Sequence, residues 1–446
     1  MNLIAKKLFG TFKGTVQLER EMSQLEQAYE RYMAIEKSDL LREYKALRKE
    51  VKSSAFKDNK KLLINRKFKD TEEYRDWHKY NRLKNDSKLK RYFEIQKSLE
   101  LATFLAFKET DEYELIGNKI ELKKSEQLRR FRAYEKSKDY KLYTRFHGSY
   151  LLQEDERLQQ IVSTPEFKQF KAFWSDPHRW FKTEAYQKEK RFDELAKHAD
   201  ILFYQRTDPQ IFIFYQTWEK VFDDEFNGPE LDKTKWEAGY YFSDPKLIRH
   251  YSLTTCKQAN NEGKNVTVAD GCLTIETLHE SVTARAWDEQ KGFVMFPFDY
   301  TSDVINAGNA FQMTSGLVQV KLRVRGGKIT HVCCLANERK TPQINIFHVD
   351  HKMISVGYIM NNISQNQRVR GISPYDFYIF SVEWSPENLI WRVNDHEIFR
   401  AAKGVIPSVP LFPLFASIVS QQQAGVGYLD IDWIRIYKLK EPSASH

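Results

Sequence analysis

Hydrophobic residues recur with two different periods along the chain, and the change of period divides it into two halves. In the first half they recur every three or four residues, as in the segment 18–29, which is the spacing of one helix face. In the second half they alternate with polar residues, as in the segment 317–325, which is the pattern of a half-buried strand. The pattern therefore predicts a multi-domain α plus β protein, with an N-terminal all-α helical array followed by an all-β domain.

Short phrases of similar sequence mark the places where helices of the first half are expected to begin. Residues 68–74 (FKDTEEY) resemble residues 107–113 (FKETDEY), and residues 181–186 (FKTEAY) are a shorter version. Related phrases occur at 53–56 and 163–167. The Ser or Thr hydroxyl in each can cap the free N–H groups of the next helix, and the acidic residues after it suit the positive end of the helix dipole. Because the spacing is irregular, the phrases predict degenerate helical repeats rather than a strict solenoid.

The residues that break regular structure are distributed unevenly. Residues 1–200 contain 4 of the 18 glycines and 2 of the 13 prolines, which favours helices there and short strands with turns afterwards. We therefore predict a basic helical domain over 1–207, a linker over 208–218, a β domain over 219–440 and a tail over 441–446.

The net charge of +9 belongs to the first half alone. Residues 1–200 carry 45 basic and 34 acidic side chains, whereas the other 246 residues carry 25 and 27. A basic excess raises the question of nucleic-acid binding. However, acidic residues are interspersed nearly everywhere and no recognised nucleic-acid module is present, so solvated helix faces are favoured and nucleic acid is not expected as a partner. Docking to a protein partner, or to a second copy in a homo-oligomer, through the basic helical half stays open.

Composition narrows the class of protein further. No run of about 18 apolar residues is present, so no transmembrane segment is expected. Four cysteines in 446 residues do not make a disulfide scaffold, and the adjacent pair Cys333 and Cys334 lacks the spacing of a zinc site. The first 15 residues show no secretory signal, which favours a cytoplasmic location or assembly into a particle or machine and leaves extracellular exposure open.

The second half contains five segments whose order and spacing resemble those of glycoside hydrolase family 16. They are residues 221–228 (VFDDEFNG), 271–276 (GCLTIE), 315–322 (SGLVQVKL), 377–386 (FYIFSVEWSP) and 428–437 (YLDIDWIRIY). The resemblance covers about residues 219–438 and implies a concanavalin A-like, laminarinase-type β-jelly roll, in which a glycan cleft crosses the concave face of two curved antiparallel sheets. The predicted fold of the second half is therefore a jelly-roll sandwich, with carbohydrate as its partner.

The resemblance also locates a site, and the sequence departs from the family there. Family members carry Glu-x-Asp-x-x-Glu, in which the first Glu is the nucleophile and the last is the acid/base. The matching positions here are Gln343, Asn345 and His348, so none of the three carboxylates is kept. Residues i and i+2 share a strand face but i+5 does not, so a β-bulge is needed to bring the third group round.

Other residues could serve this site. Asp350 lies two residues past His348 and is the candidate for a relocated carboxylate, while Trp287 and Trp384 are candidates for stacking on sugar rings. Many family members hold a structural calcium near the domain ends, for which Asp223, Asp224 and Asp432 are candidates. No other cofactor is expected.

Three functions follow as hypotheses. The favoured one is a catalytically impaired protein that binds a β-glucan or galactan without hydrolysis, while the helical half mediates assembly or partner docking. One alternative is a structural protein of a phage particle or secretion-type machine that reuses the jelly roll. The other is an active endo-glycosidase with relocated carboxylates.

Overall fold

The computed structural model describes residue 3 and residues 11–360, 363–401 and 406–441. Its chain divides into two compact units. The helical unit consists of Ala34–Arg206, and the β unit consists of the described residues up to Met33 together with those from Thr207 onward. Residues 442–446 of the predicted tail lie outside the described residues.

The predicted helical array is confirmed. Its helices, with the first and last ones that flank it, are α2 Thr15–Glu36, α3 Asp39–Val51, α4 Ser54–Asn65, η1 Phe68–Asp70, α5 Glu72–Lys84, α6 Ser87–Gln96, α7 Leu99–Lys108, η2 Asp111–Gly117, α8 Lys119–Lys124, α9 Glu126–Lys136, α10 Lys138–Phe146, α11 Tyr150–Ser163, α12 Pro165–Ser175, η3 Arg179–Lys182, α13 Glu184–Ala196, α14 Ala199–Arg206, η4 Pro209–Phe212 and α15 Ile213–Thr217. No described helix is long and apolar enough to cross a membrane.

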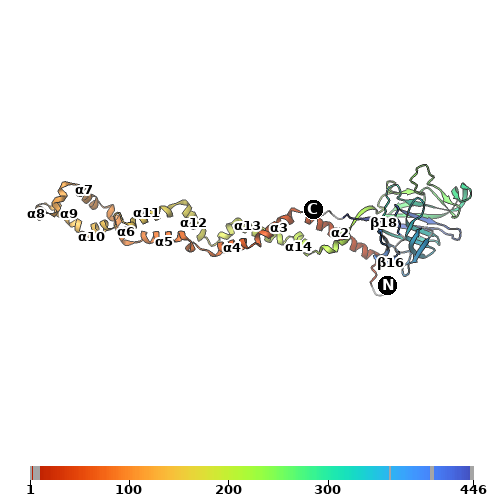
Figure 1. Cartoon of the computed structure of the whole chain (residues 1–446), viewed down its shortest axis with the longest axis horizontal. Coiled ribbons are helices and arrows are strands. Elements are labelled where there is room, and N and C mark those ends of the chain that lie inside the picture. Colours follow the sequence, from red (N-terminus) through yellow and green to blue (C-terminus); the bar gives the residue numbers. More distant parts are fainter. Residues whose placement is uncertain (1–2, 4–10, 361–362, 402–405, 442–446) are drawn as a thin grey trace. The chain divides into compact units, whose positions relative to one another are not determined.

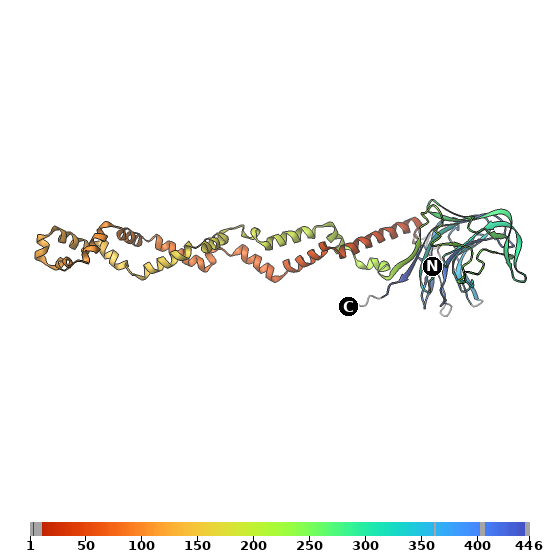
Figure 2. The same ribbon diagram turned by 90° about the horizontal axis from the view of Figure 1, so that it is seen from above.

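Within the helical unit, the chain runs out along one leg of helices and returns along a second. Helix α3 packs against α13, α5 against α11, and α6 against α10; Figures 1 and 2 show the outgoing and returning legs side by side. Aromatic and aliphatic side chains fill the space between the legs, with Tyr92 stacked on Tyr143 and Tyr44 stacked on Phe192. The amphipathic stripes of short helices are thus buried against each other, because none is long enough to be stable alone.

Single hydroxyl groups connect successive helices of the array. The backbone N–H three residues ahead donates at 3.1–3.2 Å to the side-chain oxygen of Ser38, Ser53, Thr71, Ser98, Ser125, Ser137, Thr164 and Thr183. The same hydroxyl donates at 2.6–2.9 Å to the carbonyl three residues back in Ser38, Ser53, Thr71, Ser98, Thr164 and Thr183. Each such hydroxyl satisfies one free N–H group at the start of the next helix. It also gives a second hydrogen bond to a carbonyl of the preceding helix, which already accepts from the backbone N–H of the same residue.

The caps predicted at Ser53, Thr71, Thr164 and Thr183 are confirmed by these bonds. Thr110 differs, because its hydroxyl donates to the Phe107 carbonyl at 2.7 Å but accepts no capping bond. The element that follows Thr110 is a 3₁₀-helix, whose tighter turn changes the position of the free N–H groups.

The β unit is a sandwich of two sheets. Its strands are β1 Trp218–Asp224, β2 Glu237–Ala238, β3 Ser252–Leu253, β4 Gln258–Asn260, β5 Val266–Ala269, β6 Cys272–Asp288, β7 Gly292–Ser302, β8 Val304–Asn306, β9 Gly316–Gly326, β10 Thr330–Ala336, β11 Gln343–Asp350, β12 Met353–Met360, β13 Ile363–Arg368, β14 Tyr378–Trp384, β15 Leu389–Val393, β16 His396–Arg400, β17 Phe412–Ile418 and β18 Gly427–Leu439. The larger sheet has the order β16-β15-β14-β9-β18-β6-β7-β4, and the smaller has the order β13-β12-β11-β10-β17-β8-β2. The predicted all-β sandwich is therefore confirmed.

Alternation along the strands places the core between the sheets. On β9, Val318, Val320 and Leu322 are fully buried in this core, while Lys321 and Arg323 lie on the opposite face. This is the alternation expected of a strand with one buried face. The strand predicted from this segment is confirmed.

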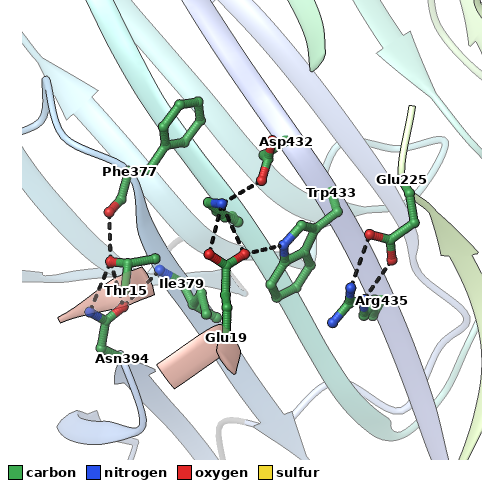
Figure 3. A network of polar contacts seen from close by, with 10 residues as sticks. Thr15, Glu19, Glu225, Phe377, Ile379, Asn394, Asp432, Trp433 and Arg435 are labelled. Atoms are coloured by element: carbon green, nitrogen blue, oxygen red, sulfur yellow. Dashed lines mark hydrogen bonds and ion pairs between the residues drawn. The ribbon is translucent and has the colours of Figure 1, made fainter. Parts of the chain in front are cut away.

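The first turns of helix α2 pack on the outer face of the larger sheet. Leu18 and Met22 form an apolar cluster with Ile379 of β14 and Trp433 of β18. Figure 3 shows the polar contacts beside this cluster. There Glu19 accepts hydrogen bonds from Lys321 Nζ and from Trp433 Nε1, each at 2.9 Å.

Two domain boundaries differ from the prediction. Residues 1–207 were predicted as one helical domain, whereas the described residues up to Met33 belong to the β unit, because the apolar stripe of α2 is buried against strands. The predicted linker 208–218 contains the short helices η4 and α15, and β1 begins at Trp218. Helix α2 covers part of the outer face of the larger sheet and not the outer face of the smaller sheet.

Candidate functional site: an amide pair beside a pocket

Strand β11 contains the β-bulge that the residue spacing requires. On one side, Asn345 pairs with Cys334 and Phe347 with Cys333. On the other side, the register slips between Asn345 and His348. One extra residue is thereby accommodated, which reverses the alternation of side chains beyond it.

The bulge sorts the side chains of β11 into two groups. Ile344, Ile346, Phe347 and Val349 lie in the core between the sheets. Since Ile346 and Phe347 are neighbours in sequence, both point inward only because the strand is bulged between them. The predicted site residues Gln343, Asn345 and His348 therefore occupy the outer face, and Asp350, two residues past His348, shares it.

A tryptophan from the other sheet supports the bulge. Trp391 of β15 is fully buried, and its Nε1 donates a 2.8 Å hydrogen bond to the backbone carbonyl of Asn345. A bulge leaves a ladder group unpaired, and an unpaired buried carbonyl would destabilise the fold. The indole N–H satisfies the Asn345 carbonyl. Trp391 therefore stabilises the bulged backbone of the site from the core side of the sheet.

Gln343 and Asn345 form a neutral pair. The Gln343 Nε2 atom donates to Asn345 Oδ1 at 2.6 Å. Asn345 is buried and Gln343 is half-buried. Two amides in contact offer further donors and acceptors without any charge, which suits hydrogen bonding to hydroxyl groups and does not supply a nucleophile.

Burial favours the neutral form of His348. Burial lowers the pKa of His348, and the negative charge of Asp350 only partly opposes this effect. Its Nδ1 atom lies 3.4 Å from the Ser355 hydroxyl. A neutral imidazole can exchange a proton or a hydrogen bond, but the strand provides no carboxylate opposite it at position 343.

The carboxylates at the two ends of β11, Asp350 and Glu338, each have hydrogen-bond partners of their own. Asp350 accepts hydrogen bonds from Gln423 Nε2 and from His351 Nδ1, each at 2.7 Å. Glu338 precedes the strand at its other end and accepts from the backbone N–H and the hydroxyl of Ser243, at 2.9 and 2.7 Å. From Gln343 to Asp350 the strand extends about 20 Å, so Asp350 and Glu338 lie at opposite ends of the strand.

A pocket of about 190 Å³ opens beside Gln343. Its floor consists of side chains from the outer faces of β10 and β17, namely Val332, Cys334, Ala336, Phe412, Leu414, Ala416 and Ile418. Its walls come from the segment between β2 and β4, from β4 and β8 themselves, and from the segment before β11. Their residues are Tyr240, Tyr241, Leu253, Cys256, Gln258, Asn260, Val304, Asn337, Glu338 and Lys340. The pocket is therefore mainly apolar, and its charged groups are the Glu338 carboxylate and the Lys340 ammonium, beside several amides.

The side chains of the two neighbouring cysteines point to opposite faces of the smaller sheet. Cys333 lies in the core between the sheets, whereas Cys334 lines the pocket. Burial raises the pKa of Cys334 to about 12 and that of Cys333 well above its usual range. Thiols that point to opposite faces and stay protonated do not form a metal site.

The two tryptophan candidates differ in solvent exposure. Trp384 is only 1% exposed and lies in the core between the sheets, so its prediction as a sugar-stacking residue is wrong. The alternation on β14 places it on the same face as Phe380 and Val382, which lie in this core too. Trp287 is 42% exposed, and its backbone pairs with Leu253 at the pocket wall.

The three calcium candidates do not converge on one point. Asp223 pairs with Lys220 at 3.0 Å, and Asp432 pairs with Lys321 at 2.6 Å. Asp224 accepts hydrogen bonds from the Phe226 N–H and from Trp236 Nε1. Calcium requires six to eight oxygen ligands around one centre, and the described residues contain no cluster of three or more metal-binding side chains. These residues do not fit a calcium ion.

Sequence reasoning did not identify the aromatic wall of the pocket. Tyr240 and Tyr241 come from an irregular segment between β2 and β3, where no periodicity indicates which side chains face the cleft. The sequence feature that indicates this wall is the adjacent pair of tyrosines in a segment rich in polar residues.

Comparison with known proteins gives relatives for the same half of the chain. A glucan endo-1,3-beta-glucosidase A1 from Niallia circulans is 22% identical over 291 residues, which is 55% of this chain. The catalytic domain of an endo-1,3-beta-glucanase (laminarinase) from Thermotoga petrophila RKU-1 is 21% identical, with a TM-score of 0.41 over 50% of this chain and 99% of that one. A non-specific endo-beta-1,3(4)-glucanase of family GH16 is 19% identical, with a TM-score of 0.42 over 50% of this chain and 92% of that one.

The C-terminal half resembles family 16, as its sequence segments indicate. The curated relative and the two-sheet architecture agree on this point. The chain spans 41% of the length of that curated relative. No family model matches the chain.

Proposed function

We propose that the β unit binds a glycan of the β-glucan or galactan type without hydrolysing it. The observation that supports this proposal is the outer face of β11, where the bulge brings Gln343, Asn345 and His348 onto one surface beside a pocket. The relative named as a glucan endo-1,3-beta-glucosidase makes β-1,3-glucan the first ligand to test.

The chemistry of glycoside hydrolysis supports the absence of turnover. Retaining enzymes need two carboxyl groups about 5–5.5 Å apart, and inverting enzymes need two at about 6.5–9.5 Å. The face of β11 instead offers two amides in contact and a neutral imidazole. An amide accepts and donates hydrogen bonds as a carboxylate partly does, but it is not a nucleophile that forms a glycosyl-enzyme.

Binding and turnover are tested together with the full chain. Affinity electrophoresis in gels containing laminarin, lichenan or agarose measures retention, and release of reducing ends from the same polysaccharides measures hydrolysis. We expect retention by at least one polysaccharide and no release of reducing ends. Reducing-end release that is abolished by Asp350→Ala would show that the carboxylate has been relocated and would overturn the proposal.

Replacing the amide that faces the pocket tests the site itself. Gln343→Leu keeps the size of the side chain and removes its hydrogen-bonding groups, so affinity for the retained polysaccharide is expected to fall about fivefold, equivalent to about 1 kcal/mol. The matched control is Gln421→Leu, on an exposed turn outside the pocket lining, for which unchanged retention is expected. Equal retention of Gln343→Leu and the unmodified protein would place the glycan elsewhere.

Restoring the carboxylates tests whether the scaffold is otherwise intact. The double variant Gln343→Glu with His348→Glu places two carboxyl groups at the positions that the family uses. We expect it to release reducing ends from the polysaccharide that the unmodified protein binds. Binding without any release would show that the surrounding cleft has also changed.

A further inference from the structure

Exposed aromatic side chains on the hairpin of β6 and β7 lead toward the pocket. Trp287 of β6 and Phe293 of β7 are cross-strand partners whose ring centroids lie 5.1 Å apart. They are 42% and 43% exposed. The opposite face of the hairpin is anchored, since Ala286 and Phe298 pack on Ala259 of β4. The two exposed rings are thus held on a supported strand pair.

Ring contacts connect this hairpin with the pocket wall. Phe293 lies against Tyr251 at 5.4 Å between centroids, and Tyr251 lies against Tyr240 at 4.8 Å. Tyr240 lines the pocket. We call Trp287, Phe293, Tyr251 and Tyr240 the aromatic path.

A lysine supports the inner end of the aromatic path. The Lys340 ammonium lies 4.6 Å from the centroid of Tyr240 and 5.6 Å from that of Tyr251. Cation–π contact of this kind holds the rings in place, and Lys340 also lines the pocket as a hydrogen-bond donor. The inner end therefore combines aromatic faces with polar groups, which is the chemistry that recognises a sugar ring.

The size of the pocket requires a second surface for any longer chain. Its volume of about 190 Å³ is below the range of about 300–1,000 Å³ that is usual for sites enclosing a drug-sized ligand. Only a short part of a glycan fits inside, so the rest of the chain must lie on the adjoining surface. Trp287 and Phe293 are the exposed members of the aromatic path, and the buried Tyr251 connects them with Tyr240 at the pocket wall.

We propose that the aromatic path is an extended binding surface for the same glycan, on which Trp287 and Phe293 hold sugar rings that lie outside the pocket. This inference rests on the proposed function. A protein occupant is disfavoured by the number of exposed residues. The large apolar side chains that the hairpin exposes are Leu278, Trp287, Phe293 and Met295, whereas a stable protein interface uses about 20–30 residues a side.

Ligand length provides the test. Isothermal titration calorimetry with the full chain uses the hexasaccharides and disaccharides of laminarin, cellulose and agarose as probes. Trp287→Ala and Phe293→Ala are each expected to weaken hexasaccharide binding about fivefold to tenfold, from the loss of one stacked ring, and to leave disaccharide binding within about twofold. Tyr375→Ala is the matched control, because Tyr375 is 39% exposed but lies outside the path.

The outcomes separate this inference from the proposed function. If the unmodified protein binds none of the probes, the proposed function fails, and the inference fails with it. If it binds a hexasaccharide and both variants bind equally well, only the inference is overturned. Equal losses for hexasaccharide and disaccharide would also overturn it, because the rings would then belong to the pocket. Light scattering that shows self-association lost in Trp287→Ala, with glycan affinity unchanged, would assign the rings to a second copy.

Discussion

At the residue scale, the buried histidine of β10 couples the stability of the β unit to pH. His331 is almost fully buried, and its Nδ1 atom forms a 2.8 Å hydrogen bond with the Ser417 hydroxyl. Its Nε2 atom is buried and has no hydrogen-bond partner among the described residues. Burial lowers the pKa of His331 to about 4, which keeps the imidazole neutral in the folded protein.

This pKa sets the direction of a pH effect. An unfolded histidine has a pKa of about 6.5, so between about pH 6.5 and 4 the unfolded chain binds a proton that the folded chain does not. The contribution is fully present above pH 6.5 and is lost as the pH falls, by up to about 3 kcal/mol. Urea unfolding at pH 7, 5 and 4 measures it.

Other groups also titrate in this range, so the decisive quantity is a difference. His331→Gln keeps a hydrogen-bonding group for Ser417 but does not titrate, and its free energy of unfolding is expected to fall less between pH 7 and pH 4. Parallel pH curves for the variant and the unmodified protein would show that His331 does not control the effect.

At the element scale, the helical unit depends on hydroxyl groups that connect one helix to the next. Thr71 is buried, and its hydroxyl donates to the Phe68 carbonyl at 2.8 Å and accepts from the Tyr74 N–H at 3.2 Å. Thr71→Val keeps the shape, leaves the Tyr74 N–H without its capping partner and removes one of two hydrogen bonds to the Phe68 carbonyl, which still accepts from the Thr71 N–H. We expect a loss of about 1–2 kcal/mol in the free energy of unfolding, measured by circular dichroism during thermal unfolding.

A threonine in a helix interior provides the control for that substitution. The Thr103 hydroxyl is exposed and donates to the Leu99 carbonyl of its own helix, so Thr103→Val should change stability by less than about 0.5 kcal/mol. Equal effects at both positions would contradict a special role for the connecting hydroxyl.

Helix α2 offers a second prediction at this scale. Glu19 receives hydrogen bonds from Lys321 and Trp433 in a largely buried setting (Figure 3). Glu19→Ala leaves the Trp433 N–H without a partner, and a loss of about 1–3 kcal/mol is expected. Chemical denaturation followed by tryptophan fluorescence measures this loss. Glu21→Ala on the same helix removes exposed contacts with Lys13 and Gln17 and should be nearly neutral.

Much of the candidate site could be predicted from sequence because strand periodicity is simple. Positions 343, 345 and 348 can share a face only if the strand is bulged, and the structure shows that bulge. The partner of an amphipathic helix could not be predicted, because an apolar stripe such as that of α2 fits a helix or a sheet equally well. Nor does alternation say which face of β14 is inward, which is why Trp384 was assigned to the cleft.

At the scale of the whole molecule, the helical unit is an insertion within the β unit. The two connecting segments meet inside the β unit, since Tyr29 stacks on Tyr215 at 5.2 Å and Tyr32 lies 5.3 Å from Phe212. Replacing Ala34–Arg206 with a short Gly-Ser linker should therefore leave a folded β unit. We expect a cooperative thermal transition and a β-rich circular dichroism spectrum.

Removing the N-terminal segment should have the opposite effect. A chain that starts at Thr207 lacks Leu18, Glu19 and Met22, and it exposes the apolar face formed by Ile379 and Trp433. Its melting temperature should be several degrees lower than that of the linker variant. Equal melting temperatures would show that α2 is dispensable.

The hydroxyl-linked array also has a consequence for the order in which the protein folds. The β unit needs residues from both sides of Ala34–Arg206, so these must meet across a long stretch of chain. Closing a loop of that length in a disordered chain costs about 5 kcal/mol of entropy. If the array folds first, α3 packs on α13 and Gln205 bonds to Tyr44, which brings the two ends together beforehand. During synthesis the array is complete before β1 has been made. Its local contacts can therefore bring α2 close to the start of β1 before the strands of the sandwich pair.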